Sequence, residues 1–106
     1  MSTTGGFNVT FIQIIEFQTS RIDEFDALLD RWLTQSKDWR TATRSVRTKD
    51  RDRPNTYVQI VEFPSYEMAQ ENSDHEETAE FAASLAQLCD VAPAFRNLDV
   101  TRVEAM

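Results

Sequence analysis

The chain has 106 residues, of which 41% are hydrophobic and 27% are charged, and its formal net charge is −7. This length predicts one domain with a modest core, and the negative charge disfavours nonspecific nucleic-acid binding, which depends on neutralising phosphates. No apolar run approaches the roughly 20 residues of a membrane span. The single cysteine, Cys89, excludes an internal disulfide and a cysteine-cluster metal site. We therefore expect a cytoplasmic protein without a metal and without a membrane partner.

The first predicted element is a strand over Phe7–Phe17, FNVTFIQIIEF, which is rich in β-branched and aromatic residues. Residues 1–6 form a polar leader that lacks the basic and apolar stretches of a secretory signal, so one domain is expected over residues 7–106. Alternation places Phe11 on one face of the strand, and Ile12 and Ile14 on the other. Because both faces are apolar, both are expected to be covered.

A helix is predicted next, over RIDEFDALLDRWLTQS, with Thr19 or Ser20 as its cap. Its apolar residues recur at three- and four-residue steps and form one broad face. Trp32 belongs to this face, so we expect it in the core and not at a cofactor.

A hairpin is predicted to follow the helix. Thr41–Arg51 alternates weakly and carries basic side chains, which indicates a strand with one solvated face. Asp52–Asn55, DRPN, is a turn signal, and Thr56–Phe63, TYVQIVEF, is a strong strand that should run antiparallel to the preceding one.

Two helices and a strand complete the pattern. Ser65 can cap a short helix that ends near Asn72. A second helix should begin with a capping box made by Ser73 with Glu76, or by Asp74 with Glu77. Its apolar face includes Phe81, Leu85 and Leu88, and Cys89 beside them is expected to be a small buried hydrophobe and not a nucleophile. A last strand is predicted over Phe95–Glu104.

Charge is distributed unevenly along the chain. Seven of the eleven basic residues lie between Lys37 and Arg53, whereas Glu62 to Asp90 holds eight acidic residues and no Lys or Arg. Two solvated faces of opposite sign explain this distribution. Attraction between the two segments, within one chain or across a subunit interface, is the alternative.

The element order strand, helix, strand, strand, helix, strand predicts an α+β, ferredoxin-like fold with a four-stranded antiparallel sheet and both helical segments on one face. The other sheet face would then expose apolar side chains of the first strand. An exposed apolar sheet face implies a partner. A second copy related by a two-fold axis is the natural one, so we expect a homodimer through the open sheet face.

The stretch YVQIVEFPSYEMAQENSDHEETAEFAASL resembles the antibiotic-biosynthesis-monooxygenase-like family of the dimeric α/β barrel superfamily. The resemblance implies a dimeric barrel and a pocket between the sheet and the helices. It also implies a reaction in which an aromatic substrate loses a proton and its anion reduces oxygen without metal or flavin. Other superfamily members degrade haem, decarboxylate or isomerise substrates, or respond to stress.

Laid against that family, Asn72 takes the place of a histidine found in many relatives, and Glu80 takes a second polar position. Asparagine can hydrogen-bond an enolate or peroxide, but it cannot act as a base. His75, the only histidine, lies near the start of the second helix. It is interpreted either as a catalytic group or as a solvated residue at a helix end.

The candidate site therefore contains Asn72 and His75 as catalytic residues. The expected substrate contacts are Trp39, Arg44, Tyr57 and Asn8. Aromatic side chains expected in the walls are Phe7, Phe11, Trp39, Tyr57, Phe63 and Phe81. Arg44 and Arg47 lie on the same predicted strand and could each bind an anion bidentately; of the two, Arg44 is expected to be better placed for a cavity.

Three classes of function remain open at this point. The first is a cofactor-independent monooxygenase, or related tailoring enzyme, acting on a small phenolic or quinone-like substrate. The second is a nonenzymatic small-ligand-binding or stress-response dimer on the same scaffold. The third is a haem-binding protein with His75 as its axial ligand. A cavity with converging polar groups would favour the first class over the second.

Overall fold

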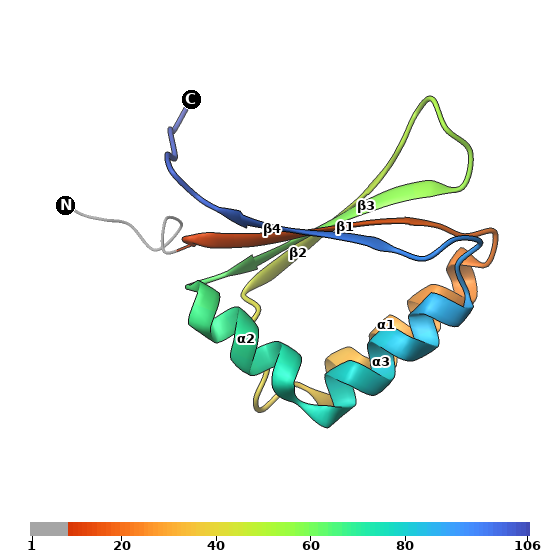
Figure 1. The fold of residues 1–106 in the computed structure, drawn as a ribbon, viewed down its shortest axis with the longest axis horizontal. Coiled ribbons are helices and arrows are strands. Elements are labelled where there is room, and N and C mark those ends of the chain that lie inside the picture. Colours follow the sequence, from red (N-terminus) through yellow and green to blue (C-terminus); the bar gives the residue numbers. More distant parts are fainter. Residues whose placement is uncertain (1–8) are drawn as a thin grey trace.

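The computed structural model describes residues 9–106, and the predicted leader, Phe7 and Asn8 lie outside the described residues. The elements are β1 (Phe11–Gln18), α1 (Ile22–Gln35), β2 (Arg44–Lys49), β3 (Thr56–Phe63), α2 (Tyr66–Asp74), α3 (Glu76–Gln87) and β4 (Ala94–Asp99). The strands form one antiparallel sheet in the order β2-β3-β1-β4, and all three helices lie on one side of it (Figure 1). This arrangement confirms the predicted ferredoxin-like fold.

The strands end where their pairing ends. β3 has the predicted bounds, and it pairs along its whole length with β1. β2 is shorter than the predicted Thr41–Arg51, and β4 stops at Asp99, opposite Phe11, instead of continuing to Glu104. The prediction was too long here because alternation continues in the sequence beyond the last residue that has a neighbouring strand.

Side-chain caps were predicted at three helix starts, and the structure has one of them. Ser65 caps α2 by accepting a hydrogen bond from the Met68 amide at 3.1 Å. At α1 the cap residue is Arg21, which makes no side-chain cap bond. Thr19 is fully buried there and donates through Oγ1 to the Leu88 carbonyl at 2.7 Å. The same hydroxyl accepts a hydrogen bond from the Arg21 amide at 3.0 Å, so Thr19 binds the residue that precedes the helix and not an amide of its first turn.

The capping box predicted at the start of α3 is also absent. His75 is both the C-cap of α2 and the N-cap of α3, and it makes no side-chain cap bond. α2 continues through Asp74, two residues beyond the predicted end near Asn72. Ser73 and Asp74 are therefore helical residues of α2 and are not available as caps for the next helix.

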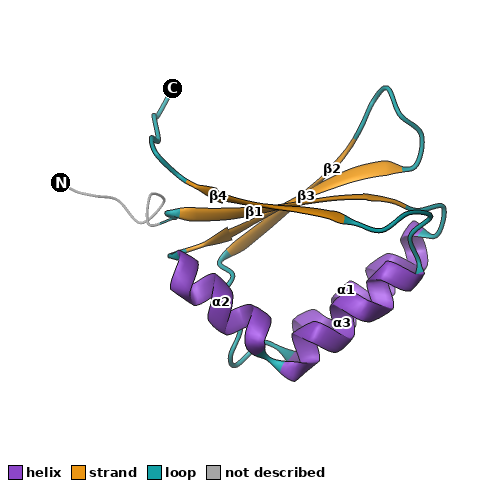
Figure 2. Cartoon of the chain, in the orientation of Figure 1, coloured by secondary structure: helices purple, strands orange, loops and turns teal. Residues whose placement is uncertain are grey.

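The helices contact the sheet through two separate apolar clusters. Near one end, Ala69 of α2 packs against Phe11 and Phe63. Near the other end, Phe25 of α1 stacks on Phe17 at 4.3 Å between ring centroids, and Phe17 stacks on Tyr57 at 5.4 Å. The helices meet at an angle and bridge the middle of the sheet between these clusters (Figure 2).

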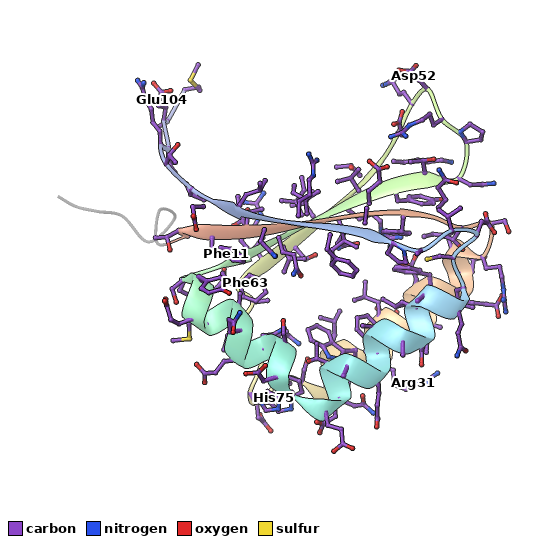
Figure 3. The ribbon with its side chains drawn as sticks, viewed as in Figure 1. Phe11, Arg31, Asp52, Phe63, His75 and Glu104 are labelled. Atoms are coloured by element: carbon purple, nitrogen blue, oxygen red, sulfur yellow. The ribbon has the colours of Figure 1, made fainter. Side chains whose placement is uncertain are left out.

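The opposite face of the sheet, which we call the open face, carries none of the helices of residues 9–106. Its apolar centre is formed by side chains from all four strands, namely Ile12, Ile14, Val46, Val58, Ile60 and Leu98. Charged residues flank this centre: Glu16 and Glu62, with Arg44 and Arg96. The β2–β3 turn with Asp52 and the C-terminal segment with Glu104 both project on this side (Figure 3).

Candidate functional site

A cavity of about 590 Å³ lies between the inner face of the sheet and the helices. Its volume falls within the range of small-molecule sites. The apolar part of its lining comes mainly from the helices and from alternate residues of the strands: Ile15, Phe17, Phe25, Leu29, Trp32, Leu33, Val61, Phe63, Phe81, Leu85 and Phe95. The cavity therefore has the size and the apolar character needed to hold an aromatic ligand.

Polar residues also contribute to the lining of the same cavity. They are Gln13, Arg40, Thr43, Arg44, Ser45, Arg47, Gln59, Asn72, Ser73 and Thr78. Among the described residues that line the cavity, none carries a carboxylate or an imidazole. The lining can donate and accept hydrogen bonds and can stabilise negative charge, but it supplies no ordinary general base.

Asn72 is the predicted catalytic residue that lies in the cavity. It sits in the last turns of α2, is only 6% exposed, and contributes to the lining. Its Oδ1 accepts a hydrogen bond from the Thr41 amide at 3.2 Å, which fixes the plane of the side-chain amide. No described residue accepts a hydrogen bond from its Nδ2. The buried amide therefore has one satisfied oxygen and two N–H donors available to a ligand.

The two arginines of β2 occupy different surroundings, although both contribute to the lining. The Arg44 guanidinium is paired with Glu62 at 3.8 Å, and that side chain is 67% exposed, at the margin of the open face. Arg47 is paired with Asp26 of α1, and its guanidinium lies over the rings of Phe25 and Tyr57. The half-buried, packed guanidinium of Arg47 is therefore the one held beneath the helices.

His75 lies at the vertex between α2 and α3 (Figure 3) and does not belong to the cavity lining. Its imidazole stacks on Trp39, with ring centroids 3.6 Å apart and an interplanar angle of 13°. Trp39 also contacts Trp32 edge-on at 6.3 Å and is likewise absent from the lining. These two predicted site residues therefore pack against each other outside the cavity lining.

The remaining predicted contacts are distributed as follows. Tyr57 is 8% exposed and packs in the apolar cluster with Phe17, not in the cavity lining. Phe63 and Phe81 line the cavity, whereas Phe11 packs beneath α2 without lining it. Asn8 lies outside the described residues.

Sequence reasoning missed Gln13 and Gln59, which line the cavity from β1 and β3. A signal was present in the alternation, because Gln13 shares a strand face with Phe11 and with the apolar residues after it. A polar side chain at a position facing a helix layer is unusual and indicates either a buried hydrogen bond or a ligand contact.

Two enclosed polar atoms in the helix layer have no hydrogen-bond partner among the described residues: Trp32 Nε1 in α1 and Thr78 Oγ1 in α3. Phe81 stacks on Trp32 at 5.2 Å, and the Arg40 guanidinium lies 5.6 Å from the Trp32 ring. An enclosed unpaired polar atom destabilises a fold, and aromatic packing around Trp32 offsets this cost.

Cys89 is half-buried and follows α3, where its thiol donates to the Leu85 carbonyl at 3.3 Å. Burial and the adjacent Asp90 carboxylate raise the pKa of the Cys89 thiol.

Among the described residues, no group of three or more His, Cys, Asp or Glu side chains is arranged to hold a metal ion. Within the same part of the chain, no helix has the length and apolar character required to cross a membrane.

Comparison with solved structures gives several matches over nearly the whole chain. SnoaB, a cofactor-independent oxygenase from Streptomyces nogalater, has a TM-score of 0.74 at 14% identity, covering 90% of this chain and 96% of its own. An antibiotic biosynthesis monooxygenase has a TM-score of 0.68 at 13% identity, covering 87% and 99%. A conserved protein from Methanosarcina mazei Go1 has a TM-score of 0.71 at 11% identity, covering 86% and 93%.

The sequence itself matches no protein-family model and no curated protein. At these identities, the structural matches establish the fold. They confirm, at that level, the resemblance inferred from the sequence: this chain has the fold of the antibiotic-biosynthesis-monooxygenase-like proteins.

Proposed function

We propose that this protein is a cofactor-independent monooxygenase acting on a small aromatic substrate of the phenolic or quinone-like class. The observation that carries the proposal is Asn72, a buried amide in a largely apolar cavity, with its oxygen held by Thr41 and its N–H donors unpaired among the described residues. The similar fold of SnoaB, a cofactor-independent oxygenase, supports the proposal.

The proposed reaction converts a ring CH₂ group beside a hydroxylated aromatic system into a carbonyl. The substrate first loses a proton, and its anion transfers an electron to O₂. The two radicals then form a C–O bond, the resulting peroxide anion takes up a proton from water, and the hydroperoxide loses water. One oxygen atom enters the product and the other leaves as water, so the substrate itself supplies the electrons that reduce O₂.

The cavity contributes orientation and charge stabilisation to this reaction. Because no described lining residue is a carboxylate or an imidazole, the substrate must be acidic enough to lose its proton without a protein base. The Asn72 N–H donors can stabilise the oxyanion of the deprotonated substrate, an interaction that is strong in a site that excludes water. The Arg47 guanidinium adds positive charge at the sheet surface of the cavity.

Oxygen uptake with 1,8-dihydroxyanthrone, corrected for autoxidation, tests the proposal. Asn72→Asp keeps the acceptor for the Thr41 amide but removes the N–H donors, so we expect kcat to fall by about 10²-fold. His75→Ala is the matched control, because His75 does not line the cavity, and its kcat should stay within about twofold. An active Asn72→Asp variant would contradict the role of Asn72. Uptake no faster than autoxidation would instead favour nonenzymatic ligand binding.

We further propose that the protein is a homodimer in which the open faces pack together. The apolar centre of each open face would be covered by the other, and its flanking Glu and Arg residues would face opposite charges across a two-fold axis. Exposed Leu98, at 42%, adds to this surface. The turn at Asp52 and the C-terminal segment project on the same side and would extend along the partner.

A further inference from the structure

Two glutamines lie on the inner face of the sheet, where a ferredoxin-like fold ordinarily places apolar side chains. Gln13 of β1 is opposite Val61, and Gln59 of β3 is opposite Ile15, so the two glutamines are diagonal neighbours on one face. Both are half-buried and both line the cavity. The inner face thus presents amides to the cavity from its two central strands.

Each glutamine is held by one polar neighbour on an outer strand. Gln13 Nε2 donates to Asn97 Oδ1 of β4 at 3.2 Å, and Gln59 Nε2 donates to Ser45 Oγ of β2. In this arrangement no described residue donates a hydrogen bond to either Oε1. A half-buried amide with an unused acceptor is stabilised when a ligand donates to it.

Both pairs can also reverse their direction. Rotating the terminal amide of Gln13 exchanges its oxygen and its NH₂ group, and Asn97, another amide, can then donate in place of accepting. Ser45 is a hydroxyl and can equally donate to or accept from Gln59. After reversal the pairs persist, and each glutamine presents N–H donors to the cavity instead of an acceptor oxygen.

We infer that Gln13 and Gln59 are specificity residues that bind the oxygen substituents of a flat aromatic ligand, as hydroxyls in one amide orientation and as carbonyls in the other. The aromatic rings of Phe25, Trp32 and Phe81 form the opposite wall. This inference rests on the proposed function and deepens it: the proposed oxidation keeps the hydroxyls of the substrate and adds a carbonyl, so a site with reversible amides can bind both the substrate and its more acceptor-rich product.

Anaerobic calorimetric titration tests the inference with three probes of related shape. They are 1,5-dihydroxynaphthalene, with two donors; 2,3-dimethyl-1,4-naphthoquinone, with two acceptors; and naphthalene, with neither. We expect the native protein to bind each oxygenated probe at least about tenfold more tightly than naphthalene, since each net hydrogen bond contributes roughly tenfold.

The variants are Gln13→Met and Gln59→Met, which keep side-chain length but remove the amide. Each substitution should weaken the binding of dihydroxynaphthalene and of dimethylnaphthoquinone by about tenfold and leave the binding of naphthalene unchanged. Gln70→Met is the matched control, because Gln70 is exposed on α2 and does not line the cavity. Thermal unfolding of each variant establishes that it is folded.

The inference is overturned if naphthalene binds as tightly as the oxygenated probes, if no probe binds, or if both glutamine variants keep the native preference. If the glutamine variants lose affinity for the dihydroxy probe alone, the claim that the amides reverse their orientation would be refuted. Oxygen uptake separates this inference from the proposed function. Selective binding without oxygen uptake would refute the proposed enzymatic function and support the two glutamines as specificity residues. Oxygen uptake that is unaffected in the glutamine variants would support the enzymatic function and refute the role of the glutamines.

Discussion

Asn72 and His75 are close in the sequence but occupy different environments. The side chain of Asn72 enters the cavity, whereas His75, at the junction of α2 and α3, packs on Trp39 outside it. The sequence placed both near a helix boundary; the family resemblance singled out Asn72, and His75 was considered as the only histidine. The sequence could not separate their environments, because α2 continues to Asp74 and this changes which residues point inward.

Cys89 gives a prediction at the scale of one residue. Burial and Asp90 raise its pKa, so the thiolate, which is the reactive form, is rarer at neutral pH than in a free cysteine. We expect alkylation by iodoacetamide at pH 7.5 to be about tenfold slower than for glutathione, and to accelerate only as the pH rises through the raised pKa. Mass spectrometry of the labelled protein measures the rate.

The control for this measurement is the same protein in guanidinium chloride, where the thiol should react as an ordinary cysteine. Alkylation of the folded protein at or above the rate of glutathione would contradict the assignment of Cys89 as a packing residue. It would also mean that quinone-like compounds could modify it, which would complicate binding measurements.

At the scale of elements, the sequence predicted strongly patterned segments well and their termini poorly. β3 was predicted with its observed bounds because its apolar pattern is continuous and turn or breaker residues stand at both ends. The predicted side-chain caps of α1 and α3 were wrong for different reasons. The Thr19 hydroxyl donates to the distant Leu88 carbonyl, whereas Ser73 and Asp74 are themselves residues of α2. Cap motifs are local patterns, and the packing of a distant segment or the length of the preceding helix decided whether they were used.

The β2–β3 turn gives a prediction at this scale. Asn55 has a positive φ of 58°, a conformation that asparagine tolerates and most other non-glycine residues do not. Asn55→Ala should lower the free energy of unfolding by about 1 kcal/mol, whereas Asn55→Gly should change it little. Urea unfolding monitored by circular dichroism measures both, and equal effects of the two substitutions would refute the backbone explanation.

At the scale of the whole molecule, the sequence correctly indicated that both faces of the central strand are apolar. Figure 1 shows the described helices on one face only, so the described part of the chain leaves the other face uncovered. The cavity was expected from resemblance, but its glutamines were not, because a sequence does not show which inward positions lie beneath packed side chains and which lie beneath a hollow. That distinction depends on the angle between helices.

Ile60→Glu tests the proposed dimer. Ile60 lies on the open face opposite Ile14, at the centre of the sheet, so a buried charge there should prevent association. Light scattering coupled to size-exclusion chromatography should give the mass of two chains for the native protein and of one chain for Ile60→Glu. Ala83→Glu, an exposed position on α3, is the control and should leave the mass of two chains. A native protein with the mass of one chain would refute the proposal.

The two apolar clusters that join the helices to the sheet stand apart, with the cavity between them. The helices therefore contact the sheet at two separate places, and the cavity lies between these contacts. A ligand bound in that space would pack against both parts of the core. It would raise the free energy of unfolding by roughly 2.7 kcal/mol at a concentration one hundred times its dissociation constant. An increase in the thermal unfolding temperature would therefore identify compounds that bind in the cavity, before any reaction is known.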